Sequence, residues 1–225
     1  MINGRSEDTL RAAADVLRAE TGGNVRSVAA DLDVQEQRER LLAACPEADI
    51  LVNNNGGPAP GSFQSWGHAE WLAALESNLL APIAMIRALL PGMRERRFGR
   101  IVNVTSAMVK APVAPMGLST TARSGLTALC KALSREVARD NVTINNLLPE
   151  RIDTDRQTQM AEIVSKLAGI SLEEARERQV QSIAAGRLGR PEEFGDACAF
   201  LCSAQAGYIS GQNLQLDGGS YPGVV

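Results

Sequence analysis

Short apolar runs alternate along this chain with longer stretches in which apolar residues recur at helical spacing. The short runs predict strands at residues 25–30, 50–53, 100–104, 143–148 and 213–216, with the tail of another strand at residues 1–3. The longer stretches predict helices at residues 6–21, 33–45, 69–96 and 118–138, and from residue 191 onward. Strands that are apolar on both faces are typical of a parallel sheet covered by helices on both sides.

Residues that favour helix starts stand at the beginning of several of these stretches. Ser6 suits an N-cap, because its hydroxyl can accept a hydrogen bond from a free backbone N–H of the first turn. Asp33 with Glu36, and Ser171 with Glu174, have the spacing of a capping box. We therefore expect helices to begin at Asp33 and at Ser171.

Strands that alternate with helices predict a doubly wound α/β fold, in which a parallel sheet carries helices on both faces. The chain has 225 residues, a common size for one such domain, and 44% of them are hydrophobic, which is enough to build a core. No internal repeat, low-complexity tract or linker interrupts the pattern. We expect residues 1–225 to form a single Rossmann-like domain.

Charge and hydropathy narrow the range of partners. The formal net charge is −3, so the basic excess typical of a nucleic-acid binder is absent. The most apolar stretch, residues 79–93, is interrupted by Pro82, Arg87 and Pro91, and we expect no membrane span. The first residues lack the charged and apolar regions of a signal peptide, so we expect a cytoplasmic protein.

Few residues are suited to catalysis or metal binding. His68 is the single histidine, which excludes a multi-histidine metal site. The four cysteines form no CxxC pair, so we expect no bound metal, and Cys198 and Cys202, one helical turn apart, fit small buried side chains in a reducing compartment. Two tyrosines, Tyr208 and Tyr221, are the only phenols.

Several short motifs follow the predicted strands. In chain order they are Asp31-Leu32, the NNNGG segment at 53–57, Thr105-Ser106-Ala107, Leu148-Pro149 with Thr154, the GRLGRPEE segment at 186–193 and the segment at 211–219. Each is weak alone, but their order and spacing are specific. The chain resembles the short-chain dehydrogenase/reductase family, and within it the 3-oxoacyl-carrier-protein reductases, over essentially its whole length.

This resemblance implies a domain that binds NADP(H) or NAD(H), with NADP(H) favoured because Arg5 stands where the family often binds the 2′-phosphate. The cofactor contacts that it implies are Arg5, Asp31, Leu32, Asn53, Asn55, Gly56, Pro149, Ile152 and Thr154. Asp31 and Leu32 would line the adenine pocket, and the last three would contact the nicotinamide. On the residues alone, Arg5 also suits a solvated charge at a helix start and Asp31 a turn cap.

The same resemblance implies four catalytic positions. Ser106 matches the serine that binds the substrate carbonyl, and Asn78 the asparagine that holds a proton-relay water. The family places a tyrosine and a lysine, four residues apart, where this chain has Ser119 and Arg123. Ser119 and Arg123 share one helix face, although they also suit a helix cap and an ion-paired surface residue. The aliphatic hydroxyl of serine is a poorer acid than the phenol of tyrosine, and arginine, unlike lysine, keeps its proton. We therefore expect the rate of proton transfer to fall by about 10²–10⁴-fold.

The glycine-rich turn of the family, which binds the pyrophosphate at a helix N-terminus, does not occur in this sequence. The resemblance places Met1 where the second strand of the family is ending. We therefore expect the first βα unit, about 30 residues, to be missing. Its strand lies mid-sheet in the family, so its two neighbours would keep unpaired edges.

Two functions follow from these observations. The first is an NADP(H)-linked oxidoreductase of small carbonyl or secondary alcohol substrates, weak or inactive because of the replaced pair, with Lys110 and His68 as lesser candidates for the proton donor. The second is a non-catalytic relative that binds a ligand or a protein partner. The resemblance further implies a homodimer or homotetramer formed through the helices at 69–96 and 118–138 and the last strand.

Overall fold

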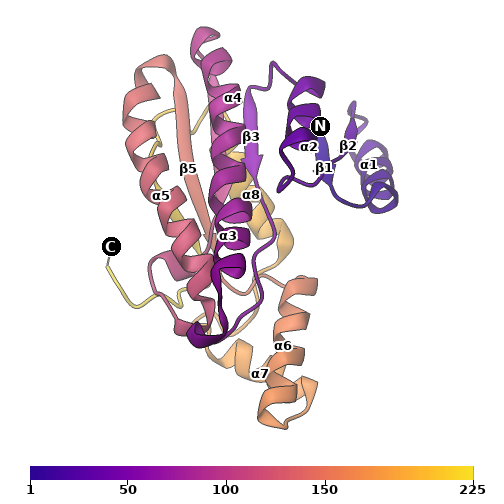
Figure 1. Ribbon diagram of the computed structural model, residues 1–225, viewed down its shortest axis with the longest axis vertical. Helices are drawn as coiled ribbons and strands as arrows, with labels where there is room; N and C mark the ends of the chain where they lie inside the picture. Colours follow the sequence, from indigo (N-terminus) through magenta and orange to yellow (C-terminus); the bar gives the residue numbers. More distant parts are fainter. Residues whose placement is uncertain (225) are drawn as a thin grey trace.

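The computed structural model describes residues 1–224 and opens with a small two-stranded unit. It consists of β1 (Ile2–Gly4), α1 (Glu7–Thr21), β2 (Ser27–Ala29) and α2 (Gln35–Ala44). The two strands are parallel, with Ile2 opposite Ser27. In Figure 1 this unit forms one side of the molecule.

The main sheet has four parallel strands in the order β3-β4-β5-β6. They are β3 (Ile50–Asn53), β4 (Gly99–Val104), β5 (Val142–Pro149) and β6 (Asn213–Leu216). All four were predicted from apolar runs, and the parallel arrangement is confirmed. The long connections between them contain helices, as parallel pairing requires.

No strand pairing joins the two sheets within residues 1–224, so β1 and β3 each present an unpaired edge. The two parts nevertheless share one apolar core, in which Ala30 and Leu41 of the small unit join Leu51 and Met85. The interface between the sheets is therefore made by side chains and not by a backbone ladder.

Helices cover both faces of the main sheet, as predicted. One face packs on α4 (Ala81–Glu95) and α5 (Gly117–Val137), which run alongside the strands in Figure 1. Ile101 and Ile144 point into this layer. Side chains alternate along a strand, so Val102 of β4 and Leu147 of β5 point to the opposite face of the sheet. There they pack against Leu201 of α8 (Pro191–Cys202).

The remaining helices extend the fold beyond the carboxyl ends of the strands. A helical pair, α6 (Asp155–Ala168) and α7 (Leu172–Gln181), packs together there and projects from the body in Figure 1.

The predicted helix at 69–96 is one helix in three parts: α3 (His68–Leu75), a π-helical turn (Glu76–Leu80) and α4. Short 3₁₀ turns at residues 63–65, 107–109, 114–116 and 138–140 complete the structure.

Two of the predicted helix starts are confirmed and one is wrong. The Ser6 and Ser171 hydroxyls accept hydrogen bonds from Thr9 N and Glu174 N at the starts of α1 and α7. Asp33 does not cap α2, which begins at Gln35. The Asp33 backbone instead donates to Asp31 Oδ1 at 3.0 Å, so the two acidic residues form a turn before the helix.

The long helix at residues 68–95 has the length and hydropathy of a membrane span, with a mean hydropathy of 1.4 in its most apolar window. Its packing gives that composition another cause. Met85, Ile86, Leu89 and Met93 are buried in the core beside the main sheet. A core helix of an α/β domain needs these apolar residues.

Candidate functional site

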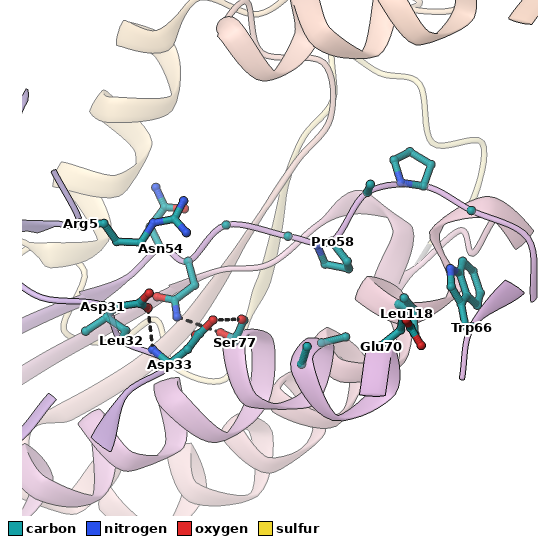
Figure 2. Close-up of a pocket in the computed structure, with 18 of the residues that line it drawn as sticks. Arg5, Asp31, Leu32, Asp33, Asn54, Pro58, Trp66, Glu70, Ser77 and Leu118 are labelled. Atoms are coloured by element: carbon teal, nitrogen blue, oxygen red, sulfur yellow. Dashed lines mark hydrogen bonds between the residues drawn. The ribbon is translucent and has the colours of Figure 1, made fainter. Parts of the chain in front are cut away.

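A cleft of about 680 Å³ lies at the carboxyl ends of β1, β2 and β3. This is the edge of a parallel sheet at which α/β proteins bind ligands, and the volume suits a small organic molecule. The loop at residues 54–61 forms its floor, between the small N-terminal unit and the start of the long helix. Figure 2 shows its side chains arranged along this loop.

One end of the cleft is polar and charged. Arg5, which follows β1, lies beside Asn54 in Figure 2, and Asp31 and Leu32 follow β2 on the same wall. The Ser77 hydroxyl donates a short hydrogen bond of 2.5 Å to Asp33, which ties the wall to the long helix. A group with hydroxyls and a negative charge fits this end, because it offers both a cation and carboxylate acceptors.

The other end is more apolar and was not predicted from the sequence. Trp66 and Leu118 line it together with Pro58. The Trp66 ring packs edge-on against Trp71, with centroids 6.0 Å apart and planes at 86°. Glu70 also lines this end, but its carboxylate accepts a hydrogen bond from Gly67 N at 2.8 Å. No sequence signal marked these residues, because they come from a loop and two helices far apart in the chain.

The cleft brings together five of the nine residues expected to contact a cofactor: Arg5, Asp31, Leu32, Asn55 and Gly56. Pro149, Ile152 and Thr154 are not among its lining residues. Pro149 pairs with Leu216 at the end of β5, Ile152 forms a bridge with Gly189, and Thr154 precedes α6. Their contacts with a nicotinamide stay a prediction.

Asn53 is buried, at 5% exposure. Its side chain does not line the cleft but forms a hydrogen bond with the neighbouring strand β4. Its amide donates to Asn103 Oδ1 at 2.9 Å. Asn103 donates to Asn146 at 3.1 Å, and Asn146 donates to Asn213 at 2.8 Å. These four asparagines occupy paired positions on β3, β4, β5 and β6 and form one amide ladder across the sheet.

Three of the four expected catalytic residues form a hydrogen-bonded cluster. The Ser119 hydroxyl lies 3.4 Å from Asn78 Oδ1, and Arg123 Nε donates to Asn78 Oδ1 at 3.1 Å and to Ser119 Oγ at 3.0 Å. The Asn78 amide donates to the Gly56 carbonyl at 2.8 Å. Asn78 lies in the π-helical turn, a distortion that is frequent at functional sites.

Arg123 is fully engaged by the protein itself. Beyond Ser119 and Asn78, its guanidinium donates to the carbonyls of Val104 at 2.9 Å, of Asn55 at 3.3 Å and of Thr105. Among residues 1–224 no carboxylate forms an ion pair with it. Burial, and secondarily the charge of Arg156, lower the pKa of Arg123 to about 10, so it stays protonated near neutral pH.

Ser106 stands apart from this cluster. Its hydroxyl oxygen accepts a hydrogen bond from Met108 N at 3.2 Å and caps the 3₁₀ turn that follows β4. Its proton is free to be donated to a ligand in that geometry. Lys110, at the end of the same turn, donates to Gln215 at 3.2 Å and lies 5.6 Å from the centre of the Tyr221 ring.

Within residues 1–224 no group of three or more histidine, cysteine, aspartate or glutamate side chains is placed to hold a metal ion. The polar groups of the cleft include a guanidinium, carboxylates, amides, serine hydroxyls and backbone atoms. Such groups bind and orient an organic ligand.

In Rossmann-like α/β proteins, dinucleotides bind in a cleft at the carboxyl edge of the parallel sheet, which is where the cleft of this protein lies. The sequence profile described as enoyl-(acyl carrier protein) reductase matches residues 1–221. The chain belongs to the short-chain dehydrogenase/reductase family.

Several characterised relatives resemble it closely. The NADPH-dependent reductase BacG of Bacillus subtilis is 32% identical over 225 residues, covering 98% of this chain and 87% of that protein. The 3-oxoacyl-[acyl-carrier-protein] reductase FabG of Escherichia coli is 31% identical over 216 residues, which cover 96% of this chain and 84% of that protein.

Solved structures show the same similarity. The NADPH-dependent reductase YwfH, involved in bacilysin biosynthesis, superposes with a TM-score of 0.92 at 31% identity, covering 99% of this chain and 88% of that one. The L-sorbose reductase of Gluconobacter frateurii, solved with NADPH and L-sorbose, gives the same TM-score at 27% identity. This superposition covers 99% of this chain and 86% of that one.

Proposed function

We propose that this protein is an NADP(H)-linked reductase of small carbonyl compounds whose turnover is slow. The family and the named NADPH-dependent relatives support the reaction class and the choice of NADP(H) over NAD(H). The bonding of Arg123 supports the slow turnover. 3-Oxoacyl compounds are the first substrates to test, because the FabG relatives are named for them.

The cleft fits the adenosine half of such a cofactor. Asp31 would accept from ribose or adenine groups, and Arg5 would donate to a 2′-phosphate. The pyrophosphate has a weaker site, because the chain contains no glycine-rich turn. The first turn of α1, the helix beside Arg5, carries Glu7 and Asp8 and its Thr9 N–H is already bound to Ser6. Affinity would therefore rest on the adenosine end.

NADPH supplies a hydride to a carbonyl carbon when it is bound. Ser106 would donate a hydrogen bond to the carbonyl oxygen, and a second group must then deliver a proton to that oxygen. Ser119 stands at the family position for this step, but it is 6% exposed and Arg123 donates to its oxygen. Arg123 keeps its proton and is engaged by three backbone carbonyls. Neither residue is a good proton donor, which is the observation that carries the proposal.

The test is a binding titration followed by an activity assay on the full chain. NADPH and NADH are titrated separately, with nicotinamide fluorescence as the readout, and NADPH oxidation is then followed with a 3-oxoacyl thioester. We expect NADPH to bind more tightly than NADH and to be consumed slowly. Failure of NADPH to bind would overturn the proposal, and rapid turnover would overturn its account of the proton donor.

A second candidate function is a non-catalytic subunit that pairs with a copy of itself or with an active homologue. An apolar groove of about 520 Å³ runs between α4 and α5, lined by Ile83, Ile86, Arg87, Leu90, Pro91, Arg94, Leu129 and Leu133. Apolar residues on an outward helix face favour helix-to-helix association. We propose a second copy of this chain as the occupant, because the family forms dimers and tetramers through these helices. Dinucleotide binding without turnover would favour this function over the first.

A further inference from the structure

We propose that Arg156 binds an anionic group of the substrate, so that the preferred substrates are carbonyl compounds that carry a carboxylate or a phosphate. This inference rests on the proposed function and names the substrate class of the same site. Arg156 lies in the first turn of α6, in the helical pair beyond the carboxyl ends of the strands. Its guanidinium donates a hydrogen bond of 3.1 Å to the carbonyl of Pro58, on the loop that lines the cleft.

The contact of Arg156 with this loop falls in the middle of the cleft. Figure 2 shows Pro58 between the polar end, at Arg5, and the apolar end, at Trp66. Arg156 thus brings a cation from the helical pair to a point where a bound ligand can also contact the cleft walls.

The same stretch of loop lies on the buried cluster around Arg123. Arg123 donates to the Asn55 carbonyl at 3.3 Å, three residues before the carbonyl that Arg156 bonds. Gly57 lies between them, where an added Cβ would be 3.4 Å from Arg123 Nη2 and 3.6 Å from Ser119 Oγ. Two guanidinium groups therefore hold one short segment, and an anion at Arg156 would lie beside the expected site of proton transfer.

The positive charges of these two groups are not balanced by acidic side chains. Neither Arg123 nor Arg156 takes part in an ion pair with any residue from 1 to 224. Arg176 of the same helical pair, by contrast, is paired with Asp153 at 2.8 Å. Burial, and after it the charge of Arg156, lower the pKa of Arg123, because like charges disfavour each other. A bound anion would offset this repulsion.

The surroundings favour an anion that is attached to an apolar body. Arg156 is exposed, so its guanidinium can turn from the Pro58 carbonyl to a ligand. Trp66 and Leu118 line the adjacent apolar end of the cleft, and Arg5 offers a separate cation at the polar end. A short oxo acid would therefore bind its carboxylate to Arg156, with its carbon chain toward Trp66.

The first test compares one ketone with and without a negative charge. Levulinate, a short oxo acid, and its methyl ester carry the same ketone, which is far enough from the carboxyl group to keep nearly the same reactivity. Ligand-observed NMR measures the affinity of the unsubstituted chain for each compound, with and without NADPH, and NADPH oxidation is followed separately. We expect levulinate to bind about 10-fold more tightly than the ester.

The two readouts separate this inference from the proposed function. Equal affinities for levulinate and its ester, or binding of neither compound, would overturn the role of Arg156. A clear preference for levulinate without any NADPH oxidation would support that role and overturn the proposed reductase function alone.

Variants then assign the preference to Arg156. Arg156→Gln should lower the affinity for levulinate about 10-fold and leave that for the ester unchanged, whereas Arg156→Lys should keep most of the preference. Arg178→Gln removes an exposed arginine of α7 that is paired with Glu174, and should change neither affinity. An equal loss for acid and ester in Arg156→Gln would mean that Arg156 only holds the loop at Pro58, and would overturn the proposal.

A titration with NADPH separates the two possible sources of the anion. The pyrophosphate of the cofactor offers the same chemistry to a guanidinium as a substrate carboxylate does. If Arg156 binds the substrate, the unsubstituted chain and Arg156→Gln should bind NADPH equally well. Weaker NADPH binding in Arg156→Gln, with an unchanged preference for levulinate, would assign Arg156 to the cofactor and overturn the substrate assignment.

Discussion

Arg123 Nε donates a hydrogen bond of 3.0 Å to Ser119 Oγ across one turn of α5. A lysine at position 123 would place one flexible ammonium group there, whereas the arginine fork spans Ser119, Asn78 and three backbone carbonyls at once. The donors of this pair are therefore used to hold the structure.

The double substitution Ser119→Tyr with Arg123→Lys tests this interpretation. In these 225 residues alone we expect little gain in NADPH oxidation with a 3-oxoacyl thioester, because they contain no glycine-rich turn to bind the pyrophosphate. Grafting a glycine-rich strand–turn–helix unit onto the N-terminus should strengthen dinucleotide binding. In that graft the double substitution should raise turnover by about 10²-fold or more. The graft without the substitutions is the control, and brisk turnover by it would point to another donor such as Lys110.

Arg123 should also matter for stability. Arg123→Met keeps the length of the side chain but leaves the carbonyls of Asn55, Val104 and Thr105 without this donor. We expect the free energy of unfolding in urea to fall by about 2–4 kcal/mol, because buried polar groups lose their partners. Arg178→Met is the matched control: that side chain is exposed and paired with Glu174, and its loss should cost less than about 0.5 kcal/mol.

Arg5 should decide between the two nicotinamide cofactors. Arg5→Gln removes the cation at the polar end of the cleft, and we expect NADPH affinity to fall about 10-fold or more while NADH affinity is unchanged. Arg11→Gln makes the same charge change on the exposed face of α1 and should alter neither affinity. Equal losses for both dinucleotides in Arg5→Gln would remove the assignment of Arg5 to a 2′-phosphate.

Self-association should depend on the groove between α4 and α5. Sedimentation of the unsubstituted protein at micromolar concentration should show a dimer or tetramer. Leu133→Glu places a charge in this groove and should shift the protein toward monomer. Val16→Glu, at a position 55% exposed on α1, should leave the assembly unchanged. A monomer at the outset would contradict the proposed pairing.

The start of α8 should be sensitive to acid. Glu193 accepts hydrogen bonds from Arg187 at 2.7 Å and from the Arg190 backbone N–H at 2.8 Å, and these lower the pKa of its carboxyl from 4.5 to about 2. A carboxyl with a depressed pKa stabilises the fold above its unfolded pKa and loses that contribution as pH falls through the folded pKa. The stability difference between the protein and Glu193→Gln should therefore be constant above pH 4.5 and shrink toward about pH 2.

Urea unfolding at a series of pH values measures this difference. Arg187→Gln removes the main partner of Glu193 and should flatten the same pH dependence. A difference that does not change between pH 4.5 and about 2 would show that the Glu193 interactions persist in the unfolded chain.

Local signals predicted much of the fold. Ser6 and Ser171 mark helix starts because an N-cap acts within one turn, and β3 was located by a run of apolar residues before a polar turn. The Asp33 carboxylate does not cap α2 but accepts a hydrogen bond from the Ser77 hydroxyl, and the Asp31 carboxylate closes the turn before the helix. The helix α6 was not predicted, although its apolar residues Met160, Ile163, Val164 and Leu167 recur at helical spacing.

The candidate site was predictable only where it follows single strands. Arg5, Asp31 and Asn55 each come directly after a strand, so the parallel topology brings them to one edge. Trp66 reaches the cleft from a loop whose path depends on tertiary packing, and nothing in its local sequence reveals that. Asn53 shows the converse: the family resemblance implied a cofactor contact, but the strand register places it in the amide ladder.

The unpaired edges of β1 and β3 give the molecule two units that can open independently. The N-terminal unit is attached to the rest by shared apolar packing, by the ion pair of Arg38 with Glu76 at 2.6 Å, and by the contact of Asp33 with Ser77. Its amides should exchange with solvent at a lower opening free energy than those of the main sheet. The cleft has walls from both units, so a ligand that spans it binds only their joined form and lowers the population of the open form by mass action.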